Sequence, residues 1–170
     1  MWEHKSTASA SQCTPSMSWK TPEARRQLLL QLKDAAKLLT PYAHKRPVEF
    51  ITNDTPEVEA LLVVLEQVLL HGIKIIEFNG TVPLWAFLER LEVQTPPCLP
   101  LRSAVGAVAC IDTLRTPLAK ARGWLRQSLN TKCLDESMSF IMNYGDKWLQ
   151  KFYYDEAILA DKGDSEILVC

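Results

Sequence analysis

The chain has 170 residues, of which 47% are hydrophobic and 23% charged, so it is long enough for one globular domain with a core of its own. Its 19 basic and 20 acidic residues leave a net charge of −1, so the global basic field of a nucleic-acid-binding protein is missing and no nucleic acid is expected as a partner. No apolar run approaches the roughly 20 residues of a membrane-spanning helix, and the first residues lack the apolar centre of a secretory signal. We therefore expect a cytoplasmic protein.

The sequence lacks the usual motifs of catalysis and metal binding. Five cysteines are scattered without a C-x-x-C pair, which in this context is typical of free thiols in a reducing compartment. No glycine cluster and no H-E-x-x-H pair occurs, so nucleotide hydrolysis and zinc-protease chemistry are not indicated. The three histidines, His4, His44 and His71, have no catalytic partner at short spacing. We predict a protein that is not an enzyme and uses no cofactor or metal.

The N-terminal part of the chain contains a polar segment and then a first helix. Residues 1–20 are small and polar without periodicity, so they are predicted to be a flexible segment. Thr21 stands directly before a proline and a glutamate, and all three residue types favour the start of a helix. Apolar residues at helical spacing continue to Leu39, and Pro41 is predicted to end this helix.

A second helix begins at Thr55 with the same Thr-Pro-Glu pattern. Val63 and Val64 widen its apolar face so much that we expect this helix at the centre of the core. His71 is followed by a glycine that ends the helix, because glycine readily takes the left-handed turn there. The β-branched residues 73–76 are compatible with a short strand, but no second strand candidate exists to pair with it.

The rest of the chain predicts five further helices and one last short stretch capped by Ser165. The fold class is therefore all-α, a single compact domain of seven to eight helices over residues 21–170. The five expected ranges are about 84–91, 101–112, 117–130, 134–142 and 148–159.

The near-zero net charge conceals a polarised distribution. Between residues 100 and 133 six basic residues stand against a single acid, whereas from residue 133 onward three basic residues stand against eight acids. Arg115, Arg122 and Arg126 share one helical face, and Lys120 is turned roughly 160° from Arg122. This face is either solvated and paired with the acidic C-terminal helices, or a docking surface for an acidic partner. Trp124 has core spacing and is expected to be buried.

Several blocks of sequence in a fixed order carry a family resemblance. The strongest is Leu114 to Leu159, with a basic-x-Arg-x-Trp-Leu-Arg run, then Leu-Asn-x-Lys-x-Leu and a terminal Phe-Tyr pair. Leu65 to Lys74 is a hydrophobic helix ending in His-Gly-Ile-Lys. The remaining blocks are residues 28–39, Asn53-Asp54 and Trp85-x-Phe-Leu. Together they resemble the RUN domain over about residues 25–169.

The resemblance implies a non-catalytic helical domain found in proteins of membrane trafficking and cytoskeletal transport. Such domains act as effectors or adaptors for small GTPases of the Rab, Rap and Arf-like groups, and some meet motor proteins. The family's docking face corresponds here to Lys120 and Arg122, with Arg126 behind them and His71 at the neighbouring helix end. Contact with endosomal or lysosomal membranes is then expected only through partners.

Two features depart from the family pattern. Ala119 and Gly123 stand where the family usually has glycine and alanine, and a glycine inside a helix costs roughly 1 kcal/mol relative to alanine. Gly123 is expected to permit close helix packing. The family's final helix normally runs beyond what Ile167 to Cys170 supply, so the domain is expected to be cut short.

The alternative hypothesis is a helical scaffold that self-associates, or binds a cytoskeletal or motor partner, through an apolar groove. The basic face would then be merely solvated, and binding would depend little on salt. Docking on the basic face would instead weaken as ionic strength rises.

Overall fold

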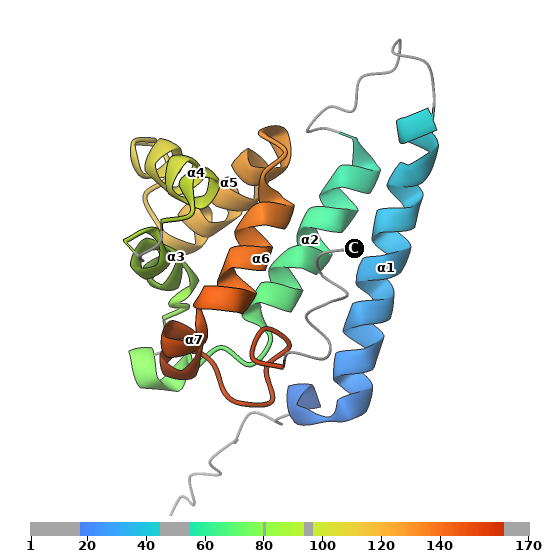
Figure 1. Ribbon diagram of the computed structural model, residues 1–170. Coiled ribbons are helices and arrows are strands. Elements are labelled where there is room, and N and C mark those ends of the chain that lie inside the picture. The colour runs from blue at the N-terminus through green and yellow to red at the C-terminus, as the bar shows by residue number, and fades with distance from the viewer. Residues whose placement is uncertain (1–17, 45–54, 80, 94–96, 162–170) are drawn as a thin grey trace, which may run out of the picture.

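The computed structural model describes residues 18–44, 55–79, 81–93 and 97–161. Over these residues it contains seven α-helices and two short 3₁₀ helices, which confirms the predicted all-α fold (Figure 1). The β-branched stretch at 73–76 forms an isolated antiparallel bridge between Ile73 and Tyr153 instead of a strand, and Ile76 begins a 3₁₀ helix. The last short helix expected at Ser165 lies outside the described residues. The elements are η1 (Ser18–Lys20), α1 (Pro22–His44), α2 (Pro56–Leu70), η2 (Ile76–Phe78), α3 (Leu84–Glu92), α4 (Leu99–Ala109), α5 (Pro117–Asn130), α6 (Leu134–Tyr144) and α7 (Asp146–Phe152).

Threonine caps begin two of the helices as predicted. The Thr21 hydroxyl oxygen accepts a hydrogen bond from the backbone amide of Ala24 at 3.2 Å. The Thr116 hydroxyl oxygen accepts one from the amide of Ala119 at 3.1 Å. Each bond satisfies an amide that the first turn of a helix leaves without a backbone partner.

Several helix boundaries differ from the prediction. α7 spans Asp146–Phe152 rather than 148–159, so the prediction that it continues through residues 157–159 is wrong, and α4 ends at Ala109 rather than at residue 112. Two further differences involve proline. Pro41 does not end α1, which continues to His44, so that prediction is wrong. Since Pro41 lies in the last turn, its missing amide hydrogen removes a bond only near the helix end. α4 begins at Leu99 rather than at residue 101, because Pro100 fits in the first turn, where no amide hydrogen is required.

α5 is the best connected helix of the bundle. It packs against α2, α3, α4 and α6, whereas α1 packs chiefly against α2 and η1. In Figure 1, α1 accordingly lies at one edge beside α2, and α3 to α5 lie on the opposite side. Trp124 of α5 is completely buried, as predicted. α2 thus contacts both the edge helix and the central helix, and its two contact surfaces differ in character.

The chain that follows α7 closes over the C-terminal end of α2, a contact that we call the α2 junction (His71, Gly72 and residues 153–158). The Tyr153 hydroxyl donates to the carbonyl oxygen of Leu69 at 2.8 Å, and the Tyr154 amide donates to the carbonyl oxygen of Gly72 at 2.9 Å. Gly72 has φ +71°, and a Cβ at this position would lie 2.6 Å from the Cβ of Ala157. Only glycine therefore fits here.

Part of the predicted flexible segment is ordered at this junction. Residues 1–17 lie outside the described part of the chain, but Ser18–Lys20 form η1 instead of a flexible end. The Trp19 ring packs edge-on against His71, with ring centres 5.5 Å apart, and stacks on Tyr154 at 5.6 Å. The aromatic contacts of Trp19, which the absence of periodicity cannot reveal, account for the difference.

Candidate functional site

Two arginines of α5 form ion pairs with two glutamates of α2. The Nε and Nη2 groups of Arg122 donate to the two carboxylate oxygens of Glu66, each at 2.8 Å. Arg126 donates to the carboxylate of Glu59. The hydrogen bonds and the charge of Glu66 raise the pKa of Arg122, so its guanidinium stays charged. The two pairs connect α2 and α5 along their exposed sides.

A partly exposed valine lies on the same side of α2 as the two glutamates. Glu59, Val63 and Glu66 are spaced at i, i+4 and i+7, which places them on one helical face. The exposed fraction of Val63 is 44%. The arrangement is an apolar position between two ion pairs. We call Glu59, Val63, Glu66, Arg122 and Arg126 the α2–α5 face.

The charged groups of the α2–α5 face remain in contact with solvent. The Arg122 side chain is 58% exposed, although its partner Glu66 is only 17% exposed. Pairs with one partner this open contribute about 1 kcal/mol or less to folding, because water and salt screen them. A guanidinium fixed by a bidentate pair still has further N–H groups with which to bind a second acceptor.

Lys120 does not join Arg122, in agreement with the helical geometry. Its Nζ lies 5.6 Å from the centre of the Trp85 ring on α3, whereas Arg122 faces α2. The two cations therefore flank α5 on different sides. Arg122 and Arg126 are brought together, and Lys120 is not beside them. Arg115 precedes the N-cap Thr116 and is not part of α5, so the prediction that it shares a helical face with the other two arginines is wrong.

His71 is buried in the α2 junction and not exposed beside the basic residues. Its side chain is 7% exposed, its Nε2 lies 2.9 Å from the carbonyl oxygen of Trp19, and its Nδ1 accepts the amide of Ile158 at 3.2 Å. Only a neutral ring protonated on Nε2 makes both bonds. Burial lowers the pKa of His71, and the positive charge of Arg25 acts in the same direction. The geometry gives His71 a structural role and leaves a partner almost no imidazole surface, contrary to the docking role implied by the resemblance.

The sequence alone does not identify the glutamates and the valine of the α2–α5 face. Its patterns group Val63 with the apolar face of its helix, and they leave open whether the arginines pair with acids of the C-terminal helices or bind an acidic partner. In the structure Arg122 and Arg126 pair with acids of α2 instead. The Glu-Val-Glu spacing is the available indication, but nothing local specifies that α5 packs beside it.

The described residues show neither a metal site nor a membrane span. Within them no group of three or more His, Cys, Asp or Glu side chains is arranged to hold a metal ion. In the same part of the chain, no helix combines the length and hydrophobicity needed to cross a membrane.

Comparison with known proteins agrees with the fold. The family model described as "RUN domain" matches residues 60–170. The chain is 29% identical to human RUN and FYVE domain-containing protein 2 over 123 residues, which is 69% of this chain and 19% of that protein. It is also 29% identical over 114 residues to human Protein RUFY3, covering 66% of this chain and 24% of that protein. The chain thus spans about a fifth to a quarter of the length of these relatives.

These matches define the class of the molecule as a helical interaction domain. The chain belongs to the RUN domain family.

Proposed function

We propose that this RUN domain is a non-catalytic adaptor that binds a small GTPase of the Rab, Rap or Arf-like group. Arg122 and Arg126 of the α2–α5 face are the main contacts, and Lys120 contributes from the flank. Family membership supports a protein-interaction role. The observation that supports this location is the exposed Val63 between two solvent-accessible ion pairs.

An apolar centre with a charged rim is the arrangement that protein interfaces commonly use. Apolar and arginine side chains near the centre supply affinity, and charges around them orient the partner and speed encounter. An acidic group of the partner would have to share or replace the Glu66 carboxylate on Arg122. The exchange is feasible because an exposed pair contributes only about 1 kcal/mol or less.

His71 supports this surface indirectly. Its bonds to Trp19 and Ile158 fix the end of α2, and α2 carries Glu59, Val63 and Glu66. In this proposal the domain is cytoplasmic and reaches endosomal or lysosomal membranes through its GTPase.

The proposal is tested by pull-down with a panel of small GTPases, each loaded with GTP or GDP. Lys120→Glu combined with Arg122→Glu is expected to reduce capture of the GTP-loaded partner at least tenfold. The melting temperature should fall by only a few degrees, because the variant loses one cation–π contact and one exposed ion pair. Arg102→Glu, at an exposed arginine of α4, is the matched control and should bind normally. Undiminished capture by the double variant would exclude this face as the site.

A second candidate function is a helical scaffold that self-associates, or binds a motor or cytoskeletal partner, through an apolar groove. One observation favours it. A long groove beside α1 has apolar residues in its lining and shares none of them with the α2–α5 face.

A further inference from the structure

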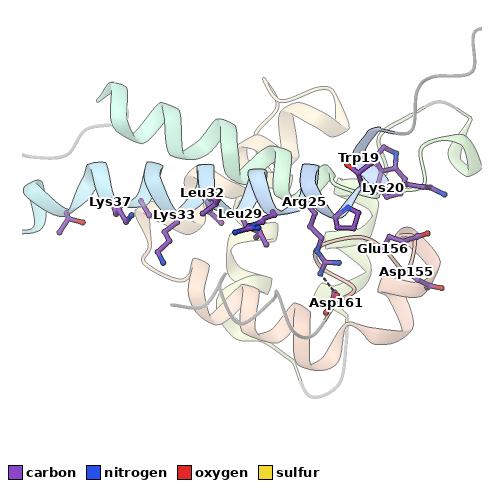
Figure 2. Close-up of a pocket in the computed structure, with 16 residues that line it drawn as sticks. Trp19, Lys20, Arg25, Leu29, Leu32, Lys33, Lys37, Asp155, Glu156 and Asp161 are labelled. Atoms are coloured by element: carbon purple, nitrogen blue, oxygen red, sulfur yellow. Dashed lines mark ion pairs between the residues drawn. The ribbon is translucent and has the colours of Figure 1, made fainter.

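A long groove lies beside α1. Its volume is about 1330 Å³, and η1, α1 and the loop that follows α7 contribute its lining (Figure 2). Along α1 it extends to Thr40, which from Trp19 is roughly 30 Å at 1.5 Å per helical residue. Small-molecule pockets usually have about 300–1,000 Å³. The size and length of the groove suit an elongated protein segment better than a compact ligand.

The floor and the rim of the groove carry apolar side chains. Leu29 and Leu32 line it and are buried against the core. Leu30 also lines it but is 53% exposed, so it is available for further contact. A helix that lays apolar side chains into such a floor is a common mode of recognition.

A row of cations follows the same helix. Arg26, Lys33 and Lys37 are spaced at seven and four residues, so they share a face of α1 with Leu30. Arg26 and Lys33 are exposed and have no acidic partner among the described residues. Lys37 has only a 3.3 Å contact with Asp34, which is exposed on the same helix.

The acids of the groove lie away from Lys33 and Lys37. Figure 2 shows Asp155, Glu156 and Asp161 beside the start of α1, whereas Lys33 and Lys37 lie toward the other end. Asp161 forms an ion pair with Arg25 at 2.7 Å. The longer part of the groove is therefore positively charged without compensation from its own acids.

We propose that this groove binds an acidic amphipathic helix of a partner protein. Apolar side chains of that helix pack on Leu29, Leu30 and Leu32, and its carboxylates pair with Arg26, Lys33 and Lys37. The charge complementarity identifies the partner as acidic, and the length and apolar floor identify it as an amphipathic helix. The proposal gives the second candidate function a location and a partner chemistry. It does not depend on GTPase binding, because the groove and the α2–α5 face share no residue.

The test uses the full chain and a synthetic 18-residue peptide with leucines at helical spacing and glutamates at the other positions. Fluorescence anisotropy should show saturable binding of this peptide. A peptide with the same leucines but with lysines in place of the glutamates should bind at least tenfold more weakly. Equal binding of the two peptides, or no saturable binding of the acidic peptide, would overturn the proposal.

Variants of α1 locate the binding site. Leu30→Glu and Lys33→Glu are each expected to weaken binding of the acidic peptide at least fivefold. Leu38→Glu is the matched apolar control, because Leu38 is 57% exposed on the same helix but does not line the groove. Arg102→Glu is the charge control. Equal weakening by these controls would show non-specific attraction and would overturn the proposal.

Two further variants test whether the peptide binds at another surface and whether another segment of the chain occupies the groove. Arg122→Glu should leave peptide binding within twofold of the wild type, and loss of binding would move the peptide to the α2–α5 face. Leu168→Asp should likewise have no effect. A tenfold gain in affinity for Leu168→Asp would assign the groove to the chain's own residues 162–170, which follow Asp161, and would overturn the partner proposal.

Discussion

α2 contacts its neighbours in two different ways. At its C-terminal end, α2 is held by hydrogen bonds of uncharged groups: both ring nitrogens of the buried His71 and the hydroxyl of the buried Tyr153 bond to the backbone. Along its exposed side, α2 contacts α5 through the ion pairs of Glu59 and Glu66. Buried bonds are costly to lose because the groups left behind have no water to replace their partners. Exposed ion pairs contribute little to folding, and for that reason they can exchange partners at small cost.

Substitution of Gly72 in the α2 junction should lower the free energy of unfolding more than any other predicted change. In Gly72→Ala the added methyl group meets the Cβ of Ala157 at 2.6 Å and its Cα at 2.9 Å, and φ of +71° is unfavourable for alanine. We expect the free energy of unfolding to fall by about 3 kcal/mol or more in urea denaturation.

The matched control for this substitution is Gly106→Ala in α4. A Cβ added to Gly106 would have no atom within 4 Å outside its own helix backbone and its chain neighbours, so stability should be unchanged or higher by up to about 1 kcal/mol. Equal stability of the two variants would contradict the close packing of the α2 junction.

Acidification should weaken the junction through His71. The pKa of His71 is lowered by burial from its usual value of 6.5. Below pH 6.5 the unfolded chain binds more protons than the folded one, so the free energy of unfolding decreases as the pH falls. The stabilisation that comes from the neutral His71 ring is fully present only above that pH. His71→Gln, which should itself cost roughly 2 kcal/mol for the two lost bonds, removes this dependence.

The measurement is the urea midpoint of both proteins at pH 7.5 and pH 5.5. The wild type should lose more stability than His71→Gln over this interval. Parallel losses would show that the ring is already free to take up a proton in the folded state.

The smallest effect on stability is expected at the α2–α5 face. Glu66→Gln removes the charge of one ion pair and should lower the free energy of unfolding by about 1 kcal/mol or less. The difference from the wild type should shrink further in 0.5 M salt, because the pair is exposed to screening. A loss of about 2 kcal/mol or more would place this pair with the buried interactions instead.

Local patterns in the sequence are sufficient for much of the helical architecture. The threonines at positions 21 and 116 cap helices because their bonds lie within one turn, and Trp124 is buried as its spacing predicts. The angular separation of Lys120 and Arg122 also follows from helix geometry alone. The prediction at Pro41 is wrong because the effect of a proline depends on how far the helix continues beyond it.

The site is less predictable because its contacts are distant in sequence. His71 bonds to Trp19 and Ile158, which are 52 and 87 residues away, and no local pattern shows that it is buried. The pairing of Arg122 with Glu66 spans 56 residues. The resemblance indicates the basic residues, but the acids and the valine that complete the surface depend on how α2 and α5 pack.

The most direct test of the account is the affinity of a captured GTP-loaded small GTPase for three proteins, measured by isothermal titration calorimetry. These are the wild type, Arg122→Glu and Glu66→Gln. The account predicts at least tenfold weaker binding for Arg122→Glu, and unchanged or tighter binding for Glu66→Gln, because the guanidinium is then released for the partner. Full affinity of Arg122→Glu, or equal losses in both variants, would contradict the claim that the α2–α5 face is the docking surface.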